Sequence, residues 1–286
     1  MAATISVVLN FFRAEFFHEA IASVLGQSRP PDEILIVNDG AATADFAQLQ
    51  RFRGVAGIRV IDQPNRGLAV ARNHGIAEAT GDWIAFLDDD DVWEPERLRI
   101  LCEYIDMHPE CEAIHNAILM MGTDVVHRKK ELTLSDFLTT FPPPSMPSAT
   151  MIRRARLLQA GMVNPALRIG QDLDCCVRVA MSSRFHYVDL PLTQRRRHGN
   201  NITRQFVKLV LVCNQIFFFY RDFYASPREY RRFTRSLNAG FLARCFYARD
   251  WATARQILRL SAIHRVSRAA LLLWTAGDVM RNRLKK

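Results

Sequence analysis

The chain has 286 residues, of which 49% are hydrophobic and 23% charged, and this length suits one large domain or two small ones. The composition excludes a disordered chain, a collagen-like fibre and a small disulfide-linked scaffold. The six cysteines show neither a C-x-x-C pair nor zinc-ligand spacing, so we expect them to be buried and reduced.

Charge is distributed unevenly along the chain. Residues 1–203 hold 21 Lys and Arg against 25 Asp and Glu, whereas residues 204–286 hold 17 against 4, so the net charge of +9 arises in the C-terminal segment. Such a segment suits lipid headgroups or nucleic acid, unless it is only a solvated helical face. Neither the N-terminus nor the apolar stretch at 209–220 has the pattern of a signal peptide or a membrane span. We expect a cytoplasmic protein, soluble or peripheral at the inner face of the cell membrane.

Short apolar strands alternate with helices along the first part of the chain. Strands are predicted at 5–9, 33–37, 58–62, 83–87 and 111–119, and helices at 14–25, 44–52, 67–79 and 95–107. This alternation predicts an α/β fold with a mostly parallel sheet and helices on both faces. A proline-rich loop is expected at 139–150. Later helices are predicted at 204–224, 227–245, 250–262 and 265–282.

Four successive aspartates, Asp88 to Asp91, follow the strand at 83–87 and give the strongest chemical signal. In an extended segment Asp88 and Asp90 point to the same side, where two carboxylates can face Mg²⁺ or Mn²⁺. The alternative is an exposed acidic turn before the next helix. Asn10 and Asp39 also follow strands, and ligands of such sheets bind outside the carboxyl ends of the strands. We therefore expect these side chains to meet in one crevice.

Several stretches occur in an order that resembles family 2 glycosyltransferases, inverting enzymes with the GT-A fold: 5–40, 65–98, 148–158 and 168–178. The resemblance implies a Rossmann-like sheet in a catalytic domain at 1–203. Its first half, 1–120, would bind a nucleotide sugar, and its second half, 121–203, the acceptor. A basic helical region would follow at 204–286.

The same resemblance assigns donor-binding roles to five residues. Asn10 and Phe12 would line the nucleotide pocket, and Asp39 would hydrogen-bond the base. Arg72 would lie near the diphosphate, and Asp89 is grouped with the donor-binding residues. The family usually has a proline or a small hydroxyl residue at position 10 and tyrosine at position 12. This chain has Asn and Phe at these positions, which leaves the nucleotide open. Uridine diphosphate is our first expectation, because the Asp39 carboxylate could accept the imide N–H of uracil, with thymidine and guanosine diphosphates as alternatives.

The resemblance also indicates which residues would bind the metal ion and which would act as the general base. Asp88 and Asp90 match the metal-binding D-x-D motif, while Asp91 would contact the sugar or cap the following helix. Asp172 would be the general base, with Asp174 as the competing candidate. Here Gln171 replaces the glutamate usual in the family.

A histidine in the family's mobile segment matches His198, in the run "QRRRHGNNIT". It would contact the diphosphate or the metal, and the alternative is a plain basic loop.

The implied function is a metal-dependent inverting glycosyltransferase. It would move a sugar from a nucleoside-diphosphate sugar to a hydroxyl of a glycan, a polysaccharide or a lipid-linked acceptor by single displacement. A nucleotidyltransferase usually opens with a glycine-rich loop, and residues 10–20 contain no glycine. A nucleic-acid-binding protein would use the basic segment, but no such motif is found and we expect no nucleic-acid partner. We expect the segment to bind an anionic membrane, with packing on the catalytic domain or dimerisation as alternatives, and the oligomeric state stays open.

Overall fold

The computed structural model describes residues 3–41, 47–128, 130–139, 147–198, 206–248 and 251–263. The chain divides into two compact units. The first comprises Met1–Phe137 and Pro144–Gly199, and the second comprises Leu138–Pro143 and Asn200–Lys286. The two units are described separately below.

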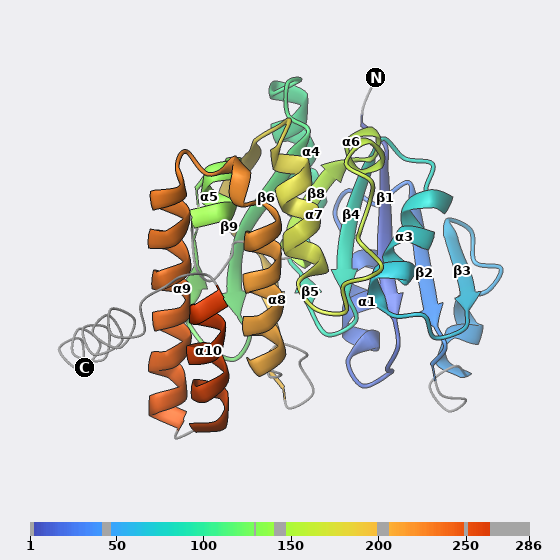
Figure 1. The fold of residues 1–286 in the computed structure, drawn as a ribbon. Coiled ribbons are helices and arrows are strands. Elements are labelled where there is room, and N and C mark those ends of the chain that lie inside the picture. Colours follow the sequence, from blue (N-terminus) through green and yellow to red (C-terminus); the bar gives the residue numbers. More distant parts are fainter. Residues whose placement is uncertain are drawn as a thin grey trace. The chain divides into compact units, whose positions relative to one another are not determined.

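One mixed sheet forms the centre of the first unit (Figure 1). Its strand order is β3 (Ile58–Gln63), β2 (Glu33–Asp39), β1 (Ile5–Phe11), β4 (Trp83–Asp88), β8 (Thr150–Arg153), β6 (Ala113–Met120), β9 (Phe185–Arg195) and β5 (Val92–Trp93), with β7 (Val126–His127) paired to β6. The four strands β3, β2, β1 and β4 are parallel, as the sequence predicts. β8 runs antiparallel to both of its neighbours, while β9 runs parallel to β6.

Helices cover both faces of this sheet. They are α1 (Phe17–Leu25), the 3₁₀ helix η1 (Gln50–Phe52), α3 (Leu68–Glu78), α4 (Arg97–Met107), α5 (Leu134–Thr139), the 3₁₀ helix η2 (Pro147–Ala149), α6 (Arg154–Gln159) and α7 (Gln171–Ala180). The helix predicted at 14–25 begins only at Phe17. The helix predicted at 44–52 and the loop predicted at 139–150 lie partly outside the described residues. The helix predicted at 265–282 lies wholly outside them.

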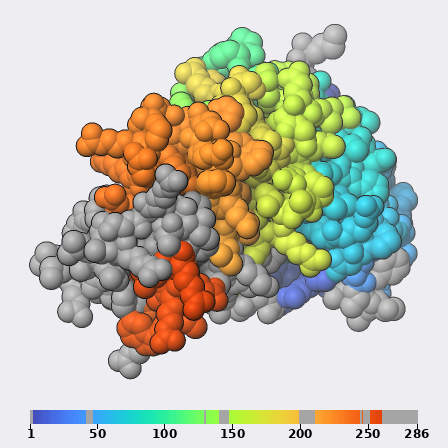
Figure 2. Space-filling model, viewed as in Figure 1, coloured from blue at the N-terminus to red at the C-terminus, as the bar shows by residue number. Residues whose placement is uncertain are grey.

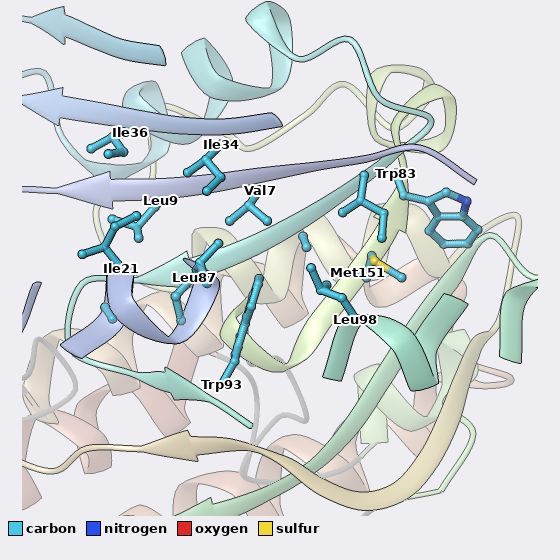
Figure 3. Packing of buried hydrophobic residues seen from close by; sticks show 14 of the residues in the cluster. Val7, Leu9, Ile21, Ile34, Ile36, Trp83, Leu87, Trp93, Leu98 and Met151 are labelled. Carbon is cyan, nitrogen blue, oxygen red and sulfur yellow. The ribbon is translucent and has the colours of Figure 1, made fainter. Parts of the chain in front are cut away.

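The two faces of β1 pack against different helices. Val7 and Leu9 join a buried cluster that includes Ile21 of α1 and Leu98 of α4 (Figure 3). On the opposite face, a Cβ atom added to Gly75 of α3 would lie 2.4 Å from a methyl group of Val8. Since no larger residue fits there without displacing that methyl group, glycine allows α3 to lie close against the sheet. This second face leads to Asn10 and Asp88, which are paired in register across β1 and β4.

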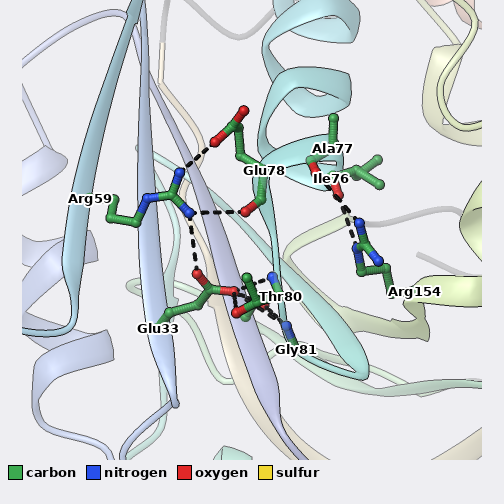
Figure 4. Close-up of polar contacts among 9 residues, drawn as sticks. Glu33, Arg59, Ile76, Ala77, Glu78, Thr80, Gly81 and Arg154 are labelled. Carbon is green, nitrogen blue, oxygen red and sulfur yellow. Dashed lines mark hydrogen bonds and ion pairs between the residues drawn. The ribbon is translucent and has the colours of Figure 1, made fainter.

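A polar network ties the amino-terminal end of the sheet together (Figure 4). The Glu33 carboxylate accepts hydrogen bonds from the Ser6 hydroxyl (2.5 Å) and from the Thr80 hydroxyl (2.8 Å) and backbone N–H (2.5 Å). Arg59 lies 3.8 Å from the same carboxylate and is also paired with Glu78. Burial raises the pKa of Glu33, but the hydrogen bonds from Ser6 and Thr80 outweigh it and leave that pKa below its ordinary value.

We predict that Glu33→Gln lowers the free energy of unfolding by about 1–3 kcal/mol at pH 7, the usual range for hydrogen bonds to a charged group. A carboxyl with a lowered folded-state pKa contributes stability above its unfolded pKa and loses it as the pH falls through the folded value. The difference between the variant and the wild type should therefore shrink below about pH 4.5. Urea denaturation at pH 7 and pH 4 measures this, with the exposed Glu103→Gln as control. An equal loss at both pH values would contradict the ionic role of Glu33.

The described part of the second unit is helical. α8 (Phe206–Phe219), the 3₁₀ helix η4 (Arg221–Phe223), α9 (Pro227–Ala248) and α10 (Trp251–Ile263) match three of the four predicted C-terminal helices, and α8, α9 and α10 pack on one another. Buried Asn214 and Asn238 exchange amide hydrogen bonds of 2.9 and 3.0 Å, which fixes the register of α8 against α9. In the space-filling view, α9 (orange) and α10 (red) contribute to the visible surface (Figure 2). No helix among the described residues is long and apolar enough to cross a membrane.

Candidate active site

Three aspartates converge where β4 ends. Carboxylate oxygens of Asp88, Asp90 and Asp91 lie within 4.8 Å of one another. Burial and the charge of Asp88 raise the pKa of Asp90, and burial and the charge of Asp90 raise the pKa of Asp91 to about 7. Carboxylates this close repel one another unless a cation neutralises them. An all-oxygen, partly buried donor set fits a hard divalent cation such as Mg²⁺ or Mn²⁺.

Asp91 belongs to this cluster and does not cap the following helix. α4 begins at Arg97, and its N-terminal cap position is Glu96. The Asp91 carboxylate instead accepts the backbone N–H of Arg196 (3.1 Å) and a hydrogen bond from Ser148. The Ser148 hydroxyl also accepts the backbone N–H of Asp88 (3.2 Å). Ser148 begins the stretch 148–158 that resembles the family, but its residue type alone did not indicate this contact with Asp88 and Asp91.

Asp89 faces away from the other three aspartates. Its carboxylate accepts the backbone N–H groups of Phe12 (3.1 Å) and Arg13 (3.2 Å). These bonds hold the loop after β1 in a non-helical conformation, which explains why α1 starts later than predicted. Burial raises the pKa of Asp89 to about 6. Asp89 therefore fixes the position of Phe12, whose exposed ring stands beside the end of β1.

A buried arginine connects the aspartate cluster to α7. Arg72 of α3 donates to Asp88 Oδ1 at 2.6 Å. Burial disfavours its charge, but the carboxylates of Asp88 and Asp172 hold the pKa of Arg72 above its ordinary value. Asp172 is the second residue of α7, which follows Gly170 in a left-handed conformation (φ 74°). Burial raises the pKa of Asp172, while Arg72 and the N–H group of Leu173 lower it. A carboxyl held in this way suits the role of a general base.

Asp174, the competing candidate for the base, has a different environment. It is buried and accepts hydrogen bonds from Arg178 Nε (3.0 Å) and a terminal nitrogen of the same guanidinium (2.8 Å). Arg178 also donates to the carbonyl oxygen of Ala160. The two-bond ion pair lies within α7 and positions Arg178, whose bond to Ala160 ties α7 to the end of α6. Asp174 is therefore engaged in a structural contact, and Asp172 is the better placed candidate for the base.

A small pocket, partly open to solvent, lies beside Asp172. Asp172 and Arg72 are its charged lining residues. The others are Phe86, Pro147, Thr150, Ile152, Val163, Cys175 and Cys176. The pocket therefore places the candidate base in a largely apolar wall.

The expected nucleotide-binding residues Asn10 and Asp39 lie at the carboxyl ends of their strands, but they differ in how far their hydrogen bonds are satisfied within the protein. Both amide atoms of buried Asn10 lack a hydrogen-bond partner among the described residues, and so does Nε of Arg72. Asp39 is largely satisfied within the protein, since it accepts the Gln63 amide (2.8 Å) and the backbone N–H groups of Arg66 (2.8 Å) and Gly67 (2.9 Å). Asp39 therefore orders the loop before α3, which leaves Asn10 as the more available polar group.

His198 reaches the aspartate cluster from the end of β9. Its Nε2 atom lies 2.9 Å from Asp90 Oδ2. Arg196, which no sequence pattern singles out, donates to the Asp90 carbonyl (3.2 Å) and to Glu19 of α1 (2.7 Å) and lies over the ring of Phe16. The run of three arginines before His198 was the available signal, but it did not show which of them turns inward.

The sequence profile of glycosyl transferase family 2 matches residues 6–148, half of the chain, and this span includes the aspartate cluster, Arg72 and Asn10. The chain belongs to glycosyltransferase family 2. This assignment confirms the resemblance seen in the sequence and favours glycosyl transfer over nucleotidyl transfer.

Curated relatives and solved structures agree with the family assignment. An uncharacterized glycosyltransferase of Nostoc is 37% identical over 124 residues, which cover 42% of this chain and 38% of the relative. The Bacillus subtilis protein TuaG, named for teichuronic acid biosynthesis, is 30% identical over 178 residues, covering 59% of this chain and 69% of its own. The structure of residues 1–349 of S. aureus TarS superposes on this chain with a TM-score of 0.61 at 16% identity. The superposition covers 99% of this chain and 92% of the TarS chain. This likeness confirms the GT-A type fold with C-terminal helices.

The chain spans between 30% and 47% of the length of four of the curated relatives that it matches.

For this family 2 chain, stability measurements separate the two candidate bases without an activity assay. Asp174→Asn should lower the free energy of unfolding by about 1–3 kcal/mol, because Arg178 loses a charged partner. Asp172→Asn should leave the free energy of unfolding nearly unchanged or raise it. The substitution removes a charge that burial disfavours, and Arg72 retains its ion pair with Asp88. Urea denaturation of both variants at pH 7 measures this. The reverse order would mean that Asp172 is the structural carboxylate.

Proposed function

We propose that the chain catalyses metal-dependent, inverting transfer of a sugar from a nucleoside-diphosphate sugar to a hydroxyl acceptor. The observation that carries the proposal is that Arg72 links two groups: it donates to Asp88 of the aspartate cluster, and it lines one pocket together with Asp172. We take the aspartate cluster as a divalent-cation site, Arg72 as a fixed positive charge and Asp172 as the base. These are the parts that a direct displacement at an anomeric carbon requires.

The donor side of the site is formed by carboxylates and arginine. Asp88 and Asp90, together with Asp91, would hold Mn²⁺ or Mg²⁺, which when bound neutralises the diphosphate and stabilises it as a leaving group. Arg72 is held rigidly by Asp88 and buried, so its remaining N–H groups meet a phosphate at little entropic cost. The unpaired amide of Asn10 lies next to Asp88 in register and would complete the contacts to the donor.

The acceptor side is formed by Asp172. Its carboxylate would take the proton of an acceptor hydroxyl, whose oxygen forms a bond to the anomeric carbon. The bond from that carbon to the β-phosphate oxygen breaks, and its electron pair leaves on the nucleoside diphosphate. Because attack and departure take place on opposite faces, a single displacement inverts the anomeric configuration.

We take uridine diphosphate as the donor nucleotide and a glycan, polysaccharide or lipid-linked acceptor as the substrate class. S. aureus TarS, which shares the fold, has been crystallised with UDP and with UDP-GlcNAc. TuaG is named for the synthesis of a polysaccharide. In this chain the exposed ring of Phe12, held in place by Asp89, can stack on a flat base of this kind.

We predict that Asp90→Ala abolishes the gain in donor affinity that Mn²⁺ gives. The substitution removes the Asp90 carboxylate, which also contacts His198, and leaves only Asp88 and Asp91 in the cluster. Removing a group from a metal site usually costs at least about 10–100-fold in metal affinity. Calorimetric titration of UDP and UDP-sugars, with Mn²⁺ and with EDTA, measures this. Asp106→Ala, at an exposed position of α4, is the matched control and should bind as the wild type does. Unchanged affinity in a folded Asp90→Ala variant would remove the metal assignment.

We predict that Asp172→Asn keeps donor affinity but lowers kcat by roughly 10²- to 10⁴-fold, the usual contribution of a positioned general base. The amide preserves the shape of the side chain but cannot accept the acceptor proton. Release of nucleoside diphosphate in a donor and acceptor screen measures turnover, and calorimetry measures binding. If Asp174→Asn showed this loss while Asp172→Asn turned over normally, the base would lie two residues further along α7.

A further inference from the structure

Three phenylalanines project from the described part of the second unit where α8 ends and η4 follows. The relative exposures of Phe218, Phe219 and Phe223 are 46%, 73% and 53%. We call these three side chains the aromatic patch. Scattered exposed apolar residues are ordinary, but three large rings within six residues are not.

The contacts around the aromatic patch hold its rings outward. Tyr220 is buried and occupies the inward position, with its ring 5.0 Å from that of Phe219 and 6.1 Å from that of Phe223. The Arg221 guanidinium lies 4.5 Å from the ring centre of Phe218 and donates to the Phe218 carbonyl oxygen (3.1 Å). The rings are thus fixed before any partner binds, which lowers the entropic cost of docking.

Positive charge predominates in the stretch of sequence that contains the aromatic patch. Arg221 and three exposed arginines in the first two turns of α9, Arg228, Arg231 and Arg232, lie within the same fifteen residues, 218–232. The acidic residues in this range are Asp222, which lies 3.8 Å from Arg221, and Glu229, whose carboxylate accepts the N–H of Ala225 (2.8 Å). The range therefore carries a net charge of +2 inside a C-terminal segment that is strongly basic throughout.

We propose that the aromatic patch and its neighbouring arginines dock on the surface of an anionic lipid bilayer. Phenylalanine side chains of an interfacial surface enter the boundary between lipid headgroups and acyl chains, and basic residues beside them are attracted to anionic lipids. Positive charge favours an anionic surface over a neutral one. The proposal does not depend on the proposed transferase activity.

Flotation of the full-length chain with lipid vesicles tests the proposal. Phosphatidylcholine vesicles with and without 30% phosphatidylglycerol (about a third anionic lipid, enough to set a negative surface potential) are compared at low and high salt. The wild type should float with the anionic vesicles at low salt, and high salt should weaken binding. The variant F218S/F219S/F223S should bind at least about 10-fold more weakly, given the area of three aromatic rings.

A matched control separates a specific surface from general stickiness. L25S/M107S/L190S removes three other exposed apolar side chains, all in the first unit, and should bind within about 2-fold of the wild type because at most one arginine lies within five residues of each. Both triple variants should keep the melting temperature and the UDP affinity of the wild type. This makes failure of the membrane proposal distinguishable from failure of the proposed function.

Two further readouts give outcomes against the proposal. Phe219→Trp should show a blue-shifted emission and quenching by brominated lipid in anionic vesicles; no change would contradict insertion. Light scattering without lipid tests self-association: if the wild type is a dimer and F218S/F219S/F223S a monomer, the aromatic patch is a contact between two copies and the proposal is wrong. Absent or charge-independent flotation of the wild type would also overturn it.

Discussion

The site depends on one buried arginine. Arg72 is held by the 2.6 Å contact to Asp88, and its charge is stabilised by Asp88 and Asp172 together. Without that cation, the carboxylate at the end of β4 and the one at the start of α7 would repel each other in a partly buried environment. Because α3 lies close against the sheet at Gly75, Arg72 has a fixed position between them. One interaction thereby sets the distance between the cation site and the candidate base.

Several polar groups near Arg72 are buried at a cost to the free energy of folding, as is common where a protein binds a ligand. Asp90 and Asp91 have raised pKa values because they share a buried space, and the amide of Asn10 has no partner among the described residues. Each of these groups destabilises the chain on its own. In the proposed function, a divalent cation and a diphosphate satisfy these groups together at the carboxyl ends of the parallel strands.

The sequence predicts much of the fold and part of the site. Strands β1 to β4 are long, apolar and separated by turns, so their pattern is clear, whereas β5 and β8 have two and four residues and no period to detect. The carboxylates at Asp88 and Asp90, spaced two residues apart after a strand, predict a cation site, and the resemblance to the family predicts Asp172 as the base. The direction of Asp89 toward Phe12 and the inward turn of Arg196 depend on contacts between segments far apart in the chain, which no local pattern encodes.

Anomalous diffraction at the manganese edge, from crystals of the full-length chain grown with Mn²⁺ and UDP, tests the central claim most directly. The account predicts one strong peak at ligand distance from Asp90 and Asp88 and adjacent to the diphosphate, with Arg72 still bound to Asp88. UDP bound with no peak at these carboxylates, or a peak elsewhere in the chain, would contradict it.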